Sequence, residues 1–165
     1  MIFATVGTQL PFERLMRALD DWAGIHPERS VVMQLSDSDY RPRHCRFVPY
    51  IWPKEWEQYF NEADLVVSHA GMGTILKSLE LGKPLIIMPR LAALGEHRND
   101  HQMATSARFD GFPNIRIVND SAELTAALND PPAATLPVDS RENVNLNALI
   151  GALKQFVDGG VIKNG

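Results

Sequence analysis

The stretch that decides the fold is SHAGMGTILKSLELGKPLIIMPR, residues 68–90. It begins where an apolar strand ends, passes two glycines separated by one residue, and continues with the spacing of a helix. Gly82, Lys83 and Pro84 then form a turn signal, and a second apolar run follows them. This succession predicts a strand, a helix and a further strand joined by short connections.

The same alternation continues on both sides of this unit. Short apolar runs predict strands at residues 2–6, 30–35, 45–51, 63–69, 84–89 and 114–118. Helices are expected at 12–22, 53–60, 74–81, about 97–109, from 120–121 onward, and at about 144–158. Strands that are apolar on both faces are typical of a parallel sheet covered by helices. We therefore expect one doubly wound, Rossmann-like α/β domain over residues 1–165, whose last helix either packs on the sheet or docks on a partner.

Composition narrows the class of protein. The chain has 165 residues, of which 45% are hydrophobic and 22% charged, and these values suit one globular domain. A formal net charge of -4 argues against nucleic acid as a main partner. The N-terminus has no basic leader, and no segment approaches the roughly 20 apolar residues that span a bilayer. We expect a cytoplasmic protein whose membrane contact is peripheral, through a partner.

The sequence contains one cysteine and five histidines, which offer little metal or thiol chemistry. Cys45 has basic neighbours that make a reactive thiol conceivable, but a strand cysteine is the favoured interpretation. His97 and His101 are four residues apart on an expected helix, yet the glutamate of H-E-x-x-H is missing. The acidic sequence SDSD at residues 36–39 is interpreted as a turn. We expect no metal and no cofactor.

Two glycine turns fall at the carboxyl ends of strands, the edge where such sheets bind ligands. They are VGTQ after the first strand and SHAGMGT after the fourth. Glycines let the backbone approach a phosphate at a helix N-terminus, and neighbouring serine, histidine and threonine side chains add hydrogen bonds. Taken alone, a G-x-G pattern is more often a tight connection with no ligand.

Three motifs in order, TVGT, SHAGMG and DHQ, resemble those of family 28 glycosyltransferase C-terminal domains. These domains form the carboxyl-terminal half of GT-B enzymes of the MurG type. The chain is more closely similar to the soluble subunits of split transferases, namely the cytosolic subunit of the dolichol-linked GlcNAc transferase and bacterial PssE-like proteins. The resemblance covers residues 1–118.

The resemblance assigns roles to individual positions. The residues implied at the donor diphosphate are Gly7, Thr8, Ser68, His69, Gly71, Gly73 and Thr74, and those implied at the sugar are Asp100, His101 and Gln102. Residues 47–50 match the segment that reads uracil. Relatives commonly bind the ribose with an acidic residue where this chain has Lys77, so Glu80 on the same helix face is the substitute that we consider. Arg90 and Arg98 would suit a uronic acid.

The resemblance also implies that this chain supplies one half of a two-part enzyme and that a partner supplies the other half. It predicts the UDP-sugar-binding catalytic subunit of a two-component inverting glycosyltransferase. This subunit would be active with a membrane-anchored subunit that holds a polyprenyl-diphosphate-linked acceptor. The setting is exopolysaccharide or glycan biosynthesis, and no catalytic residue is assigned to this chain. Two alternatives stay open: a UDP-sugar-binding regulator without catalysis, and an unrelated Rossmann module that binds a nucleotide.

Overall fold

The computed structural model describes residues 1–137, and the helix expected at about 144–158 lies outside them. The strands are β1 (Ile2–Thr5), β2 (Val31–Gln34), β3 (Arg46–Val48), β4 (Leu65–His69), β5 (Leu85–Met88) and β6 (Ile115–Ile117). The helices are α1 (Glu13–Ile25), α2 (Pro53–Glu62), α3 (Met72–Leu81), α4 (His101–Ala107) and α5 (Ser121–Asn129), with a short 3-10 helix, η1 (Ala92–Leu94).

The six strands form one sheet in the order β3-β2-β1-β4-β5-β6, and each neighbouring pair is parallel. The order reverses between β1 and β4, where Thr5 pairs with Ser68. A doubly wound sheet opens a crevice at this point, because the connections on its two sides run in opposite directions. The predicted Rossmann-like fold is confirmed.

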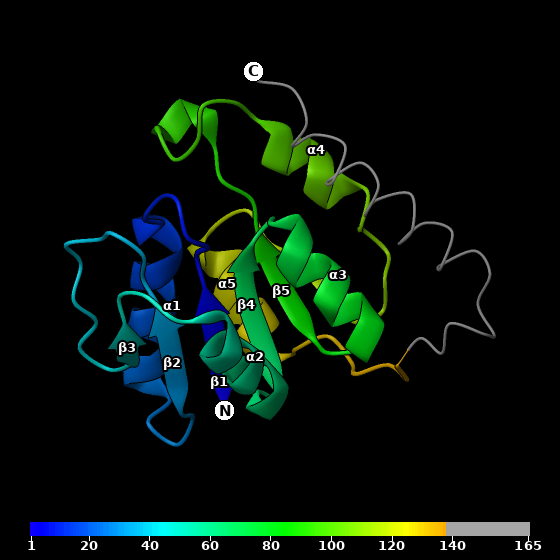
Figure 1. The fold of residues 1–165 in the computed structure, drawn as a ribbon, viewed down its shortest axis with the longest axis horizontal. Helices are drawn as coiled ribbons and strands as arrows, with labels where there is room; N and C mark the ends of the chain where they lie inside the picture. Colours follow the sequence, from blue (N-terminus) through cyan, green and yellow to red (C-terminus); the bar gives the residue numbers. More distant parts are fainter. Residues whose placement is uncertain (138–165) are drawn as a thin grey trace.

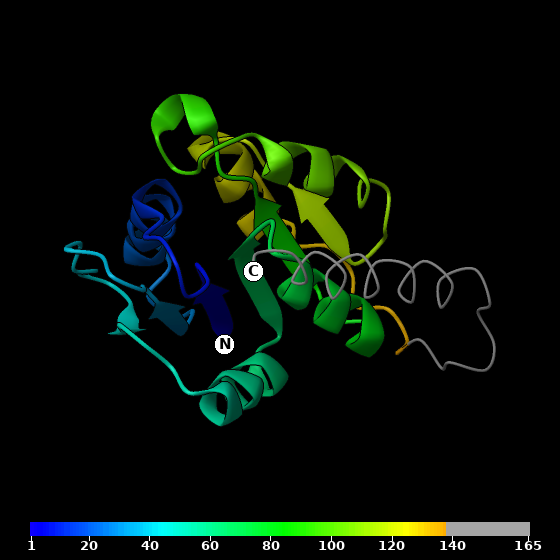
Figure 2. The same cartoon turned by 45° about the horizontal axis from the view of Figure 1, so that its top comes forward.

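Helices cover both faces of the sheet (Figures 1 and 2). In β1, Ile2 and Ala4 pack with α1 and α5, whereas Phe3 packs with α2 and α3. The Phe3 ring lies 5.6 Å from the Tyr59 ring and 6.1 Å from the Trp56 ring, centre to centre. Because successive side chains of a strand point to opposite faces, a strand buried on both faces must be apolar throughout.

One expected helix is shorter than the sequence suggested. The prediction of a helix at about 97–109 is wrong at its start, because α4 begins at His101. Gly95 adopts a left-handed conformation with φ 69°, and Glu96 and Asp100 accept backbone N–H bonds from Leu91 and Ala92. The backbone N–H groups of Asn99 and His101 bond the side chains of His97 and Asn99, and these local bonds replace the ones that a helix would make. His97 and His101 therefore do not share a helix.

Cys45 lies directly before β3 and packs against the core on the α1 side. Burial, with the carboxylate of Asp20 nearby, raises the pKa of the Cys45 thiol to about 12. A thiol reacts as its thiolate, so this environment disfavours a reactive cysteine. The interpretation as a structural residue beside a strand agrees with this placement.

Candidate functional site

The candidate site lies at the switch point, where the turns after β1 and β4 face each other. Gly7 follows β1 with φ 80°, a left-handed conformation that strains any residue with a Cβ. Gly71 and Gly73 follow β4, and α3 begins between them at Met72. The free N–H groups at the start of α3 therefore point into the crevice between the two turns.

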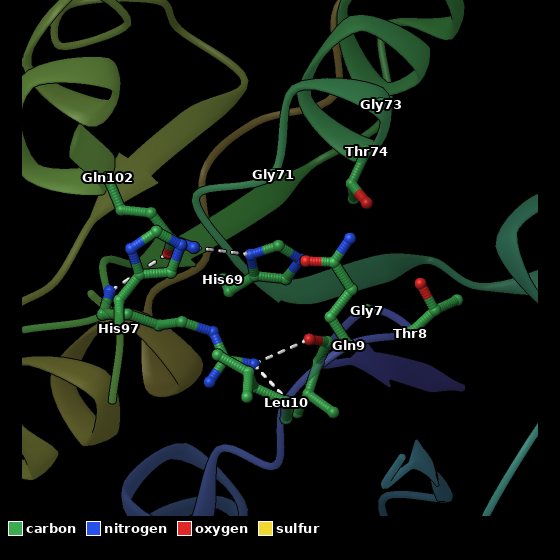
Figure 3. Close-up of a pocket in the computed structure, with 12 residues that line it drawn as sticks. Gly7, Thr8, Gln9, Leu10, His69, Gly71, Gly73, Thr74, His97 and Gln102 are labelled. Atoms are coloured by element: carbon green, nitrogen blue, oxygen red, sulfur yellow. Dashed lines mark hydrogen bonds between the residues drawn. The ribbon is translucent and has the colours of Figure 1, made fainter. Parts of the chain in front are cut away.

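The imidazole of His69 fills the space between the turns (Figure 3). A Cβ added at Gly7 would lie 2.7 Å from His69 Nε2, and a Cβ added at Gly71 would lie equally close to that atom. Real Cβ atoms do not come this near, so both positions need glycine as long as the ring stays in place. Gly73 differs, because no atom lies within 4 Å of its hypothetical Cβ. It borders open space.

Gln102 connects α4 to the ends of two strands. Its side-chain oxygen Oε1 accepts the backbone N–H of Ala70 at 3.2 Å and that of Arg90 at 3.1 Å. Its amide nitrogen lies 3.2 Å from His69 Nδ1. One side chain thus joins the residues that follow β4 and β5 and also contacts the central imidazole.

His69 is neutral at physiological pH. Burial lowers the pKa of its imidazole to about 4, and the positive charge of Arg90 acts in the same direction. The ring therefore meets a ligand as an uncharged group with one N–H donor and one acceptor nitrogen.

Arg90 places a buried positive charge beneath the turn after β1. Its guanidinium donates to the carbonyl oxygens of Val6 at 2.9 Å, Leu10 at 2.7 Å and Pro11 at 2.6 Å, and its carbon lies 4.6 Å from the centre of the Phe12 ring. Burial lowers the pKa of Arg90 to about 10, so the group stays protonated at neutral pH. These acceptors are neutral carbonyls, and the nearby carboxylate of Glu96 offsets part of the charge.

Two adjoining cavities open at this edge. The first, of about 300 Å³, has the side chains of His69, Arg90, His97 and Gln102 in its wall. The second, of about 430 Å³, is lined by Tyr50, Ile51 and Trp56 among others. Gly7, Thr8, Gly73 and Thr74 border both cavities. A cationic space joined to an aromatic one suits a diphosphate joined to a base.

The first cavity is lined by most of the residues that were expected to bind the diphosphate and by one residue of the expected sugar site. These are Gly7, Thr8, His69, Gly71, Gly73 and Thr74, together with Gln102. Ser68 does not. Its side chain is fully buried, and its hydroxyl has no hydrogen-bond partner in the structure. A direct role for Ser68 at the phosphates stays a prediction.

The expected sugar and ribose residues are more scattered. The carboxylate of Asp100 accepts the backbone N–H of Ala92 at 2.9 Å, and the exposed side chain of His101 belongs to the wall of neither cavity. Lys77 lines the second cavity, whereas Glu80 is absent from its wall. Of the segment expected at uracil, residues 47–50, Tyr50 alone lines that cavity.

The sequence reasoning missed several residues of the walls. Gln9 and Leu10 line the first cavity, and Gln34 and Trp56 the second. One feature of the sequence could have indicated Trp56, because it lies in the first turns of the helix that follows the segment expected at uracil, residues 47–50. Within residues 1–137, no group of three or more histidine, cysteine or acidic side chains is arranged to hold a metal ion. No helix of this part has the length and apolarity to cross a bilayer.

Comparison with known proteins gives a family for most of the chain. The family described as Glycosyltransferase family 28 C-terminal domain matches residues 1–125. The chain is also similar to UDP-N-acetylglucosamine transferase subunit ALG13 of Mus musculus, 39% identical over 49 residues, which is 30% of this chain and 4% of that protein. The subunit of the same name from Debaryomyces hansenii is 31% identical over 58 residues, 35% of this chain and 27% of that protein. The chain thus matches less than a third of the length of either relative.

Solved structures share the fold at low sequence identity. An NMR solution structure of ALG13 superposes with a TM-score of 0.62 at 18% identity, over 90% of this chain and 94% of that one. The glycotransferase of kitacinnamycin gives 0.61 at 19% identity, over 93% and 39%. A UDP-glucose: anthocyanidin 3-O-glucosyltransferase in complex with UDP gives 0.56 at 17% identity, over 99% and 37%.

Proposed function

Because the chain belongs to the glycosyltransferase family 28 C-terminal domain family, we propose that it binds the UDP-sugar donor of a glycosyl transfer. The observation that carries the proposal is the pair of cavities at the switch point, which share a rim of two glycines and two threonines. A nucleoside diphosphate has the same two-part chemistry, with an aromatic base at one end and a doubly charged group at the other.

The diphosphate occupies the first cavity. There the N-terminus of α3 offers backbone N–H groups, Thr74 adds a hydroxyl from the first turn of that helix, and Arg90 supplies a buried charge. When the sugar leaves the donor, negative charge grows on the diphosphate. Preorganised donors and a fixed charge stabilise that leaving group without a metal ion.

The nucleoside occupies the second cavity. Tyr50, Ile51 and Trp56 give the base an apolar and aromatic wall. Glu57 and Lys77 also line this cavity, so the ribose hydroxyls are assigned to them rather than to Glu80. Glu57→Gln should then weaken UDP more than 2′-deoxy-UDP, and an equal effect on both nucleotides would exclude Glu57 from the ribose.

The reaction is an inverting transfer. An acceptor oxygen attacks C1 of the sugar, the bond from C1 to the diphosphate oxygen breaks, and its electrons stay with UDP. The acceptor proton passes to a base, and a partner subunit supplies that base, because His69 with a pKa of about 4 is a weak base at neutral pH.

The partner is a membrane-anchored subunit that holds a polyprenyl-diphosphate-linked acceptor, in exopolysaccharide or glycan biosynthesis. This chain then works in the cytoplasm, at the membrane surface through that partner. Support comes from the names of the two relatives, each of which is described as a transferase subunit.

The test is transfer to lipid in membranes from the source cells, washed free of this chain. Labelled UDP-sugars are supplied one at a time, with the purified protein, without it, or with the Gly73→Val variant. Incorporation of one sugar that needs the wild-type protein supports the proposal and names the donor. UDP binding with no incorporation of any sugar would favour the alternative, a regulator that binds the donor and catalyses nothing. Absence of UDP binding would overturn both.

A further inference from the structure

We propose that Gln102 is a positioning residue that fixes the imidazole proton of His69 on Nε2, so that His69 faces the anion as a neutral hydrogen-bond donor. The identity of the anion, a diphosphate, rests on the proposed function. The position of the proton does not.

The orientation of the Gln102 amide follows from its backbone partners. Oε1 lies within 3.2 Å of two backbone nitrogens, those of Ala70 and Arg90, and both of these groups can only donate. The atom that they share must therefore be the amide oxygen. The amide nitrogen is then the atom that faces His69 Nδ1, at 3.2 Å.

The proton position follows from this orientation. An amide nitrogen donates and does not accept, so Nδ1 of His69 must be the acceptor in this bond. A neutral imidazole carries one proton, and the pKa of about 4 keeps the ring neutral at physiological pH. The proton is therefore on Nε2, which lies 2.7 Å from each of the Cβ positions that Gly7 and Gly71 leave empty. Figure 3 shows Gln102 on one side of the ring and the turn of Gly7 on the other.

The surroundings of His69 explain why a neutral donor is the useful form. The charged and titratable groups that face it are Arg90, from the end of β5, and His97, from the loop before α4. The turns after β1 and β4 add no ionisable side chain. A charged imidazole would oppose Arg90, whereas a ring with its lone pair on Nε2 would repel a phosphate oxygen. The Nε2–H tautomer avoids both costs.

The same geometry limits what Gln102 can do for a sugar. Its oxygen already accepts two N–H groups, and one of its amide hydrogens is directed at His69. One amide hydrogen remains. Gln102 can therefore contribute a single donor to a sugar hydroxyl, in addition to its role behind His69.

The Gln102→Glu variant inverts the hydrogen bond at nearly constant shape. A carboxylate keeps an acceptor for Ala70 and Arg90, but its second oxygen accepts from Nδ1–H. The proton of neutral His69 then moves to Nδ1, and the new charge raises the imidazole pKa. Nitrogen-15 NMR of the histidine rings, recorded without ligand at pH 8, reads the tautomer directly. We expect Nε2–H in the wild type and Nδ1–H in the variant. Nδ1–H in the wild type, or an unchanged tautomer in the variant, overturns the inference.

UDP affinity against pH gives the second measurement. At pH 8 the variant offers UDP a lone pair in place of a donor, so we expect about tenfold weaker binding, as for a lost hydrogen bond to a charged group. As the pH falls toward 5.5, the imidazole of His69 in the variant becomes imidazolium and Nε2 regains its proton. The UDP affinity of the variant should then approach that of the wild type. A role confined to holding the fold would give a ratio that does not change with pH, and this result overturns the inference.

Two controls distinguish an effect of the added negative charge from an effect of the His69 tautomer. Gln58→Glu adds the same charge on the exposed side of α2, where Gln58 bonds Glu62, and should leave both readouts at wild-type values. In a His69→Ala background, Gln102→Glu should lose its pH dependence, and persistence of that dependence contradicts the inference. If the tautomers are as expected but UDP does not bind the wild type, the proposed function fails while the proton assignment stands.

Discussion

Arg14 and Glu96 form a two-point ion pair, with Nε to Oε1 at 2.7 Å and Nη2 to Oε2 at 2.9 Å. The pair joins α1 to the loop between β5 and α4. The same arginine donates to the carbonyl oxygens of Pro89 and Asn119, and the same carboxylate accepts the N–H of Leu91. One half-buried pair therefore holds the loop that forms the outer wall of the first cavity.

Glu96→Gln should lower the free energy of unfolding by about 1–3 kcal/mol, because several charge-assisted bonds lose their charge at a site with little solvent. Glu13→Gln is the matched control, since Glu13 and Arg17 form an exposed pair one helical turn apart, and its cost should stay under about 1 kcal/mol. Urea unfolding of both variants measures the difference. Equal costs would mean that the Arg14 pair does not hold the loop.

The two glycines after β4 should respond differently to the same change. In Gly71→Val the new side chain meets the His69 ring, so both stability and UDP affinity should fall, the former by about 1–3 kcal/mol. In Gly73→Val nothing lies within 4 Å of the Cβ, so the fold should keep its melting temperature within a few degrees. The side chain instead blocks the close approach of a phosphate, and UDP affinity should fall at least about tenfold. A Gly73→Val protein with normal UDP affinity would contradict the site.

Asp20 should make stability depend on acid pH. Its carboxylate accepts the N–H groups of Arg43 and His44 and the hydroxyl of Tyr40. Burial alone would raise the pKa of Asp20, but these bonds hold it below its usual value. A lowered pKa stabilises the fold above the usual value near 4, and that contribution is lost as the pH falls through the folded-state pKa.

Asp20→Asn should therefore cost at least about 2 kcal/mol at pH 7 and much less near pH 2. Urea unfolding at both pH values measures this. Asp21→Asn, at the neighbouring exposed position, is the control and should change stability little at either pH. A cost for Asp20→Asn that does not shrink in acid would contradict the assigned role of the charge.

The fluorescence of Trp56 should report binding of the uracil base of UDP. Its ring borders the second cavity, so UDP binding should change its fluorescence, while pyrophosphate, which has no base, should not. Trp56→Phe keeps an aromatic ring against Phe3 and Phe60 and should remove most of the signal. Trp52→Phe is the control, because Trp52 is 78% exposed and belongs to neither cavity wall. A signal that depends on Trp52 would place the base elsewhere.

Local patterns predicted the sheet and the two turns well. Apolar runs and glycine positions depend on neighbours within a few residues, so β1, β4 and the start of α3 were found within about two residues. The start of α4 was not. The side chains of His97 and Asn99 bond the backbone N–H groups of Asn99 and His101 and so compete with a helix there, which apolar spacing does not report.

Contacts between distant residues were beyond sequence reasoning. Arg90 looked like a loop residue that would suit an acidic sugar, but it is 2% exposed and bonds carbonyl groups from 79 to 84 residues away. Ser68 was expected at the phosphates from the resemblance; its side chain is fully buried in β4, a burial that the motif did not indicate, and its role there stays a prediction. Lys77 rather than Glu80 lines the second cavity, and Glu80 lies almost one turn farther from the N-terminus of α3.

The site joins residues that are far apart in the sequence, and these separations affect when during folding the site can form. Thr5 pairs with Ser68, Arg90 bonds Val6 across 84 residues, and Gln102 contacts His69 across 33. Contacts of such long range form late in folding, because the entropy of closing large loops must be overcome first. On the ribosome, a nascent chain that ends before residue 102 can pair its first strands but has no completed anion pocket. A completed pocket is therefore acquired late in folding, after β1, β4, β5 and α4 have come together.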